Sequence, residues 1–305
     1  MTHQIDLRDL RYFETIAELG HLGQAAEKLC RSQPALTSCI RRLEEALGTP
    51  LFERVGRGIR LTSAGKVLLE RAQRFKTMAE ETVREVNDVA SGVSGRVRLG
   101  LVPTAAQYVL PPACRLLLAE ARDVTLKTVI AQNDVLESSL KAGELDLVIN
   151  INPKTDPELV SQEIFDDVTV VVASSSHPIF CKPATMQDLL DHRWVLAAPS
   201  VTSRRWLDQA FDNQGLPRPN VQIETNLILL LPPLIIQTGL LSFISRRHLG
   251  TGRVGAQLKE IPLEQTMMYR RFEISYRKDG YLSPAARRLV ALLCENGKNL
   301  FQEDH

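Results

Sequence analysis

The sequence has little of what marks secreted, membrane or disulfide-linked proteins. Its N-terminus, MTHQIDLRDLRYF, lacks the apolar segment of a secretory signal. The longest apolar run, Leu227–Ile236, is broken by Pro232 and Pro233 and is far shorter than the roughly 20 residues that span a bilayer. The five cysteines form no C-x-x-C pair, which fits reduced, buried thiols better than a disulfide framework. We therefore expect a cytoplasmic protein without a membrane segment.

The sequence also lacks the common motifs of catalysis, nucleotide binding and metal binding. It contains no G-x-S-x-G, H-E-x-x-H or P-loop pattern. Gly250–Gly255 fits G-x-G-x-x-G, but RRHL precedes it instead of a strand, which favours a loop. His177 and His192 have no Cys or His neighbour at metal-ligand spacing, and Arg246–His248 fits the solvated end of a strand. We expect no enzyme activity, no cofactor and no bound metal.

Positive charge is concentrated near the N-terminus, although the net charge of the chain is only +1. Between Lys28 and Arg60 there are seven Lys and Arg residues against three Glu residues. A local excess of this kind is typical of a surface that faces nucleic acid, because each neutralised phosphate releases counterions.

The stretch Leu22–Leu47 has the pattern of two short helices joined by a tight turn. Small and apolar residues recur at helical spacing in the first helix, and Cys30 and Arg31 fill the turn. Ser32 is a good N-cap for the second helix, with Pro34 in its first turn. The residues of the second helix that we expect to face a core are Leu36, Ile40, Leu43 and Leu47.

The opposite face of the second helix is polar, as in the recognition helix of a helix-turn-helix. Gln33 can bind adenine through two hydrogen bonds, and Arg41 can reach guanine or a phosphate. Further on, Leu51–Phe52 and Ile59–Leu61 flank an Arg- and Gly-rich turn, which predicts a basic β-wing along the phosphate backbone. On these residues alone, an ordinary helical hairpin with a solvated outer face remains the alternative.

The segments LRYFETIA, GQAAEKL, SQPALTSCIRRLEEALG, PLFER and RGIRLTSAG occur in the order and spacing of one known family. In these segments the chain resembles the N-terminal domain of LysR-type transcriptional regulators. The resemblance implies a winged helix-turn-helix over residues 1–62 that contacts double-stranded DNA. The expected contacts are Ser32, Gln33, Pro34, Thr37, Ser38, Arg41, Arg42, Arg54 and Arg57. Where the family often has basic or amide residues this chain has Ser38 and Cys39, so Gln33, Thr37 and Arg41 carry most of the expected base readout.

Residues 63–91 contain no proline and one glycine near their start, which predicts a single long helix. Its apolar and small residues alternate by four and three, as in a heptad seam: Leu68, Ala72, Phe75, Ala79, Thr82, Val86 and Val89. Packing within one domain does not need so long a seam, which favours a partner helix from a second copy. The resemblance implies a linker helix that pairs subunits on a pseudo-palindromic operator, in a dimer or in a tetramer built from two dimers.

From residue 92 onward strands and helices alternate, which predicts an α/β fold with a largely parallel sheet. The resemblance implies an effector-binding domain of two subdomains, similar to periplasmic solute-binding proteins. Subdomain I would comprise residues 92–167 and 270–305, and subdomain II residues 168–269, with the chain crossing twice between them.

Polar side chains follow several of the predicted strands, where ligands bind in open α/β sheets. Hydroxyl groups and free N–H groups at the starts of the following helices suit a small anion such as a carboxylate. The candidates are Thr104, Gln132, Asn133, Ser200, Thr202 and Asn226. Each one fits a simple helix cap, but their recurrence at strand ends predicts a pocket for an effector.

Together these patterns predict a transcriptional regulator whose DNA binding is controlled by a small molecule held between two α/β subdomains. Three alternatives stay open. One is a regulator that senses no ligand, and another is a solute-binding protein, which would need an export signal. The third is an α/β enzyme whose N-terminal helices only dimerise, which would need a nucleophile–base pair or a cofactor motif.

Overall fold

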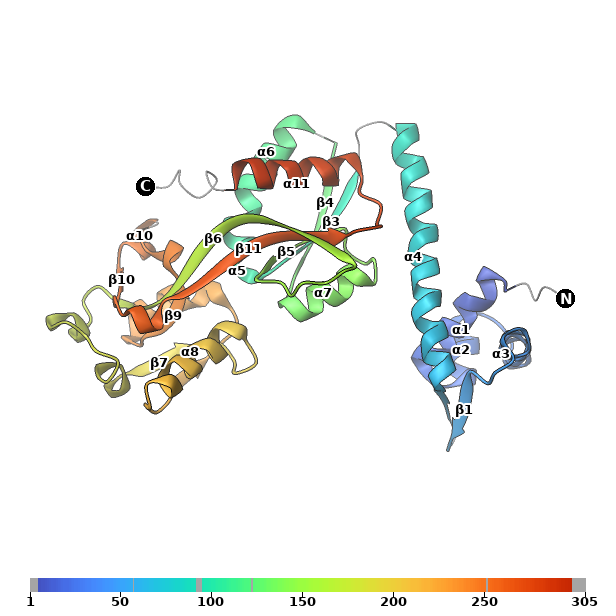
Figure 1. Cartoon of the computed structure of the whole chain (residues 1–305), viewed down its shortest axis with the longest axis horizontal. Helices are drawn as coiled ribbons and strands as arrows, with labels where there is room; N and C mark the ends of the chain where they lie inside the picture. Colours follow the sequence, from blue (N-terminus) through green and yellow to red (C-terminus); the bar gives the residue numbers. More distant parts are fainter. Residues whose placement is uncertain (1–4, 57, 92–94, 122, 251, 298–305) are drawn as a thin grey trace. The chain divides into compact units, whose positions relative to one another are not determined.

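The computed structural model describes residues 5–56, 58–91, 95–121, 123–250 and 252–297. The chain forms two compact units, one of residues 1–90 and 142–144 and one of residues 91–141 and 145–305 (Figure 1). Within the described ranges no helix combines the length and the apolar character that crossing a membrane requires. The expected DNA contact Arg57 lies outside the described residues.

The first unit is a bundle of three short helices followed by a β-hairpin (Figure 1). Its elements are α1 (Leu7–Leu19), α2 (Leu22–Lys28), α3 (Gln33–Leu47), β1 (Phe52–Val55) and β2 (Gly58–Leu61). The two strands are antiparallel, with Phe52 opposite Leu61. The predicted helix pair and both strands of the wing are therefore confirmed.

Side-chain and glycine caps set the ends of these helices. The Asp6 carboxylate accepts from the N–H of Arg8 at 2.8 Å, and the Ser32 hydroxyl accepts from the N–H of Ala35 at 3.4 Å, as expected of an N-cap. Gly20 and Gly48 end α1 and α3 in the left-handed conformation, with φ of 61° and 69°, which glycine adopts without a Cβ clash.

The core of this unit lies where α1 and α3 meet. Phe13, Leu36 and Leu43 are buried there. Cys39 is also fully buried, so it belongs to the core and not to the expected DNA-facing side; burial raises the pKa of its thiol to about 12. The expectation that Leu47 faces the core is wrong: it is 40% exposed, because it is the last residue of α3, before the turn at Gly48.

The helix α4 spans Ser63–Ser91, as predicted from the sequence. The Thr62 hydroxyl accepts from the N–H of Gly65 at 3.0 Å and caps its first turn. Leu68 and Ala72 pack against the core of the first unit. Farther along the helix an exposed apolar stripe follows, formed by Phe75, Met78, Ala79, Val83 and Val86. The side chain of Val89, the last member of the expected seam, lies outside the described residues.

The second unit is built on a seven-stranded sheet in the order β10-β6-β11-β5-β3-β4, with β9 also paired to β6. The strands are β3 (Arg96–Leu101), β4 (Thr125–Ile130), β5 (Leu147–Ile151), β6 (Leu159–Ser174), β9 (Ser242–Ser245), β10 (Leu258–Glu260) and β11 (Met268–Arg277). A separate parallel pair joins β7 (Arg193–Leu196) to β8 (Asn220–Glu224).

The expectation of a largely parallel sheet holds only in part. Strand β3 is parallel to β4 and β5, but β11 is antiparallel to β5 and β6, and β6 is antiparallel to β9 and β10. The antiparallel pairs arise because β11, after the intervening residues 175–267, returns along β6 in the opposite direction.

Helices cover the sheet and divide its side chains into separate cores. One core contains Leu99, Leu147 and Leu289 and lies among α5 (Pro103–Tyr108), α6 (Leu110–Glu120), α7 (Asn133–Lys141) and α11 (Pro284–Asn296). Trp194 and Phe211 centre another core beside α8 (Thr202–Asn213), and a third packs on α9 (Leu231–Thr238). We call the region of the first core lobe I and that of the other two lobe II; β6 and β11 run through both (Figure 1). The subdomain boundaries given above stay a prediction.

Gly65 provides a test of how closely α4 packs against the rest of the first unit. A Cβ built at Gly65 would lie 2.2 Å from the backbone oxygen of Leu51. Helix propensity predicts that Gly65→Ala stabilises the helix by about 1 kcal/mol, whereas this clash predicts a loss of about 1–3 kcal/mol. Urea unfolding should therefore show a lower midpoint than wild type, with Ser63→Ala as the exposed control. A higher midpoint would contradict the close docking.

Candidate functional site

The polar face of α3 is exposed, opposite the buried face. Gln33, Pro34, Thr37 and Arg41 are exposed along this face, with the N-cap Ser32 at its start. Five of the expected DNA contacts thus share one solvent-facing surface, which begins at the helix N-terminus. Free N–H groups there favour a phosphate oxygen, and the side chains that follow can reach base edges.

The arginines near this surface differ in how they are held. Arg41 pairs with Glu45 at 3.3 Å, and both side chains are exposed, so the pair is weak and Arg41 is free to move to another acceptor. Arg42 instead binds the buried carboxylate of Asp9 through Nη2 at 2.7 Å and Nε at 3.1 Å. The bond to Asp9 raises the pKa of Arg42. Arg54 is exposed on β1.

Arg42 and Ser38 therefore already have partners within the first unit. The Arg42 Nη1 donates to the Ser38 hydroxyl at 3.3 Å, and Ser38 is half-buried. Asp9 lies on α1, and no local pattern in the sequence connects it with α3. Both residues stay predicted DNA contacts, but in the structure Arg42 joins α3 to α1 through Asp9, and Ser38 accepts from Arg42 within α3.

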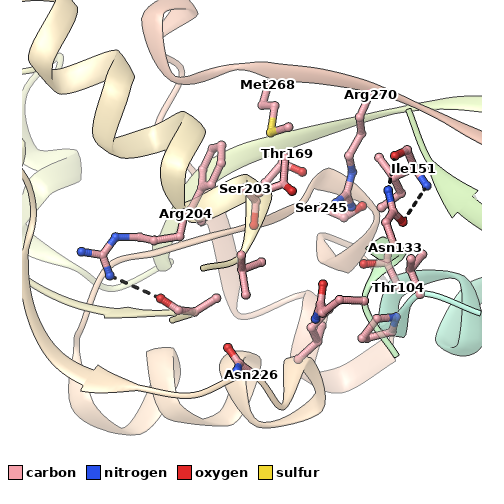
Figure 2. Close-up of a pocket in the computed structure, with 18 of the residues that line it drawn as sticks. Thr104, Asn133, Ile151, Thr169, Ser203, Arg204, Asn226, Ser245, Met268 and Arg270 are labelled. Atoms are coloured by element: carbon pink, nitrogen blue, oxygen red, sulfur yellow. Dashed lines mark hydrogen bonds between the residues drawn. The ribbon is translucent and has the colours of Figure 1, made fainter. Parts of the chain in front are cut away.

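A cavity of about 720 Å³ opens in the second unit at the ends of several strands (Figure 2). This volume is in the usual range for pockets that bind small molecules. The six residues expected from strand ends all line it: Thr104, Gln132, Asn133, Ser200, Thr202 and Asn226. The fold therefore brings together residues that the sequence scatters over more than a hundred positions.

Three of these six side chains already have hydrogen-bond partners within the protein. The Asn133 amide donates to the backbone oxygen of Ile151 at 2.6 Å, which ties α7 to β5. The Asn226 side chain accepts from the N–H of Ala198 at 3.0 Å, and the Thr202 hydroxyl accepts from Arg205 at 3.4 Å. These bonds leave the three side chains with less capacity for a ligand.

The other three side chains are available to a ligand. Thr104, Gln132 and Ser200 make no side-chain hydrogen bond in the part of the chain that the structure describes. Nearby, Val201 precedes α8 without a side-chain cap, so the first N–H groups of α8 remain for an acceptor such as a carboxylate.

Sequence reasoning missed the residues that the central strands contribute to the cavity. Thr169 on β6 pairs in register with Ser245 on β9 and with Met268 on β11, and all three line the cavity with Arg270 (Figure 2). The sequence VTVVVAS indicated only a buried strand. Its single polar residue between apolar neighbours was the available signal.

The cavity floor holds a buried cluster with more positive than negative charge. The Asp167 carboxylate binds Arg270 at 2.7 Å and lies 3.5 Å from Arg247, and it accepts from the Ser245 hydroxyl at 2.8 Å. Burial lowers the pKa of Arg247, with Asp167 acting in the opposite sense. One carboxylate between two guanidinium groups leaves a positive charge beside the cavity, which favours an anionic ligand.

The segment after β9 differs from the sequence expectation. We expected Arg246–His248 to be solvated, but His248 is only 3% exposed and lines the cavity. The chain folds back at Ser245, whose hydroxyl accepts from the N–H of Arg247, and the His248 ring packs edge-on against Tyr108 at 5.1 Å. The expected loop at Gly250–Gly255 contains a single helical turn, α10 (Gly252–Gly255).

The fold brings His177 and His192 together although they are not at metal-ligand spacing in the sequence. The fold places their rings edge to face, with centroids 4.7 Å apart. Within the described ranges, no group of three or more His, Cys, Asp or Glu side chains is arranged to hold a metal ion.

Comparison with known proteins covers both units. Residues 7–66 match the model of bacterial regulatory helix-turn-helix proteins of the lysR family, and residues 90–298 match the LysR substrate binding domain. The chain is 28% identical to the regulator GbpR of Azospirillum brasilense over 95% of this chain and 86% of the relative. It is 32% identical to the regulator PcaQ of Agrobacterium fabrum over 73% and 72% of the two chains.

Solved structures share the fold at lower identity. The regulator CbnR complexed with its target DNA has a TM-score of 0.64 at 21% identity, covering 96% of this chain and 99% of that one. A full-length variant of OxyR from Pseudomonas aeruginosa has a TM-score of 0.63 at 22% identity, covering 97% and 95%. The chain therefore belongs to the LysR family of bacterial regulators, which bind DNA through an N-terminal helix-turn-helix and small-molecule effectors through a C-terminal domain.

Proposed function

We propose that α3 reads a pseudo-palindromic operator through Gln33 and Arg41, with Thr37 between them and Arg54 on the phosphate backbone. The observation that supports this is the exposed polar face of α3, opposite its buried face. Arg41 is held only by an exposed pair, so little is lost when it turns to DNA.

Replacing the two proposed base readers should reduce specific binding. Gln33→Ala and Arg41→Ala should each cost about 1–3 kcal/mol for the operator and less for a scrambled duplex, because a lost base contact removes preference. Arg54→Ala should weaken both duplexes alike and flatten the salt dependence. Fluorescence anisotropy at two salt concentrations, with DNA from upstream of the gene itself, measures both effects. Unchanged operator preference in both alanine variants would refute the assignment.

We propose further that α4 pairs with α4 of a second copy, and that two such dimers form a tetramer on adjacent operator sites. The supporting observation is the apolar stripe from Phe75 to Val86, whose large side chains are more than half exposed: Phe75 51%, Met78 62%, Val83 61% and Val86 62%. Exposed apolar side chains in one row along a helix are typical of an interface. Two recognition helices joined in this way would face two half-sites.

A charge within this stripe should separate the subunits. Ala79→Glu places a carboxylate among the exposed apolar residues and should shift the protein toward monomers in sedimentation velocity, because the carboxylate would lose water in the seam. Gln73→Glu, on the opposite face of α4, is the matched control and should leave the profile unchanged. An unaltered sedimentation profile for Ala79→Glu would contradict the proposal that α4 forms the interface between subunits.

We propose that the cavity binds a small organic anion and that its occupation controls DNA binding. Three observations support this: the free hydroxyl groups of Thr104 and Ser200, the uncapped start of α8, and the excess positive charge where Arg247 and Arg270 share the single carboxylate of Asp167. A ligand that prefers one closure of the two lobes would shift the population of DNA-binding forms. The protein would then act in the cytoplasm as a regulator and not as an enzyme.

Thr104→Val should weaken this ligand without harming the fold. The substitution keeps the shape of the side chain and removes a hydroxyl without a partner in the described structure, so any binding acid should lose about 1 kcal/mol or more. Thermal shift and calorimetry against a panel of carboxylates measure this, with the exposed Thr128→Val on β4 as control. If Thr104→Val and Thr128→Val bind the acid with equal affinity, Thr104 is not part of the site. If no acid binds, the result favours a regulator without an anionic effector.

A further inference from the structure

Two buried polar atoms at the cavity floor have no hydrogen-bond partner among the described residues. They are the hydroxyl oxygen of Thr169 and the Nε2 atom of His248. Thr169 is 1% exposed and His248 is 3% exposed, and both residues line the cavity. Folded proteins rarely leave such atoms unpaired, because each one has lost its water without gaining a partner.

The two atoms belong to one small region of the floor. Thr169 is the register partner of Ser245 in the ladder of β6 and β9. The Nδ1 atom of His248 lies 3.0 Å from the backbone oxygen of the same Ser245. Figure 2 shows Thr169 close to Ser245, Met268 and Arg270, which all line the cavity.

The contact with Ser245 fixes which nitrogen of His248 carries the proton. A backbone oxygen can only accept, so Nδ1 donates to it and Nε2 of the neutral ring is left with a lone pair. Burial lowers the pKa of His248, while the Ser245 oxygen and Asp167 oppose that shift and Arg270 adds to it. At neutral pH His248 therefore presents an acceptor at Nε2.

These two atoms require a specific partner. A carboxylate can accept from Thr169 but has no proton for His248, so an acid group alone leaves Nε2 unpaired. A hydroxyl group can donate to Nε2 and also pair with the Thr169 hydroxyl. Both atoms are covered in this structure, and the flexible thioether of Met268, next to Thr169 in the ladder, can move aside for such a group.

We propose that the effector is a hydroxylated organic acid, whose hydroxyl group donates to His248 Nε2 and pairs with Thr169 while its carboxylate lies at the polar strand ends. This inference rests on the anionic effector proposed above and adds the second functional group. Thr169 and His248 are then the residues that select hydroxylated acids over acids without a hydroxyl group.

Matched pairs of acids test the proposal with the unaltered full-length protein. The pairs are 3- and 4-hydroxybenzoate against benzoate, malate against succinate, and gluconate against hexanoate, with affinities measured by calorimetry. Because a site built to hydrogen-bond a hydroxyl rejects analogues without one, a hydroxylated acid should bind at least about tenfold tighter than its plain partner. Acids that bind without any such preference would overturn this inference and leave the anionic effector standing. No binding by any acid, with operator binding intact, would overturn both.

Substitution of Thr169 separates ligand recognition from a structural role. Thr169→Val should remove most of the preference for the hydroxylated acid. The thermal midpoint of the ligand-free protein should stay the same or rise, because the lost hydroxyl had no partner. Thr128→Val, exposed on β4, should keep the preference. A Thr169→Val variant that keeps the preference, or whose ligand-free midpoint falls by several degrees, would show that ordered water pairs the hydroxyl and would overturn the proposal.

Discussion

The pairing of β6 with β11 is the constraint on which the second unit depends. The two strands run antiparallel from Leu159 opposite Arg277 to Thr169 opposite Met268, and so pass through both lobes in one ladder. The stacked rings of Phe165 and Phe272, with centroids 4.5 Å apart, and the buried pair of Asp167 with Arg270 stabilise its middle. Removing either partner of that pair would leave an unpaired buried charge. Because the same pair belongs to the cavity floor and to the ladder that connects the lobes, a substitution there affects both.

Local patterns predicted the elements that short-range physics determines. The period of apolar residues and the cap at Ser32 predict α3, and the lack of proline over residues 63–91 predicts α4, because capping, one-sided burial and helix continuity depend on residues within a few positions. The polar strand ends also predicted residues of one cavity, since carboxyl ends of parallel strands meet at one edge of a sheet. Thr104 and Gln132, at the ends of β3 and β4, follow that rule.

What the sequence could not supply depends on contacts between distant residues. Arg42 resembles an exposed basic residue of a DNA-binding face until Asp9, on another helix, is placed beside it. The local sequence assigns Thr169 to a buried strand and His248 to a solvated end, and only the antiparallel ladder brings both to the cavity. Local periodicity does not encode strand order, so neither the antiparallel pairs nor the residues they place together were predictable.

The magnitudes of these contacts indicate how an effector can act. Moving a two-state equilibrium from 1:99 to 99:1 requires about 5.5 kcal/mol of difference in binding between the states. A neutral hydrogen bond supplies about 0.5–1.5 kcal/mol and one to a charged group about 1.5–3 kcal/mol, so several contacts must be made in one state alone. Thr104 and Gln132 belong to lobe I and Ser200 to lobe II, whereas Thr169 and His248 lie at the floor between them. A ligand held only by the floor would bind open and closed forms alike. In the proposed mechanism, an acid that also reaches both walls would gain its extra contacts only on closure. Recognition at the floor would then select the ligand, and the walls would convert binding into regulation.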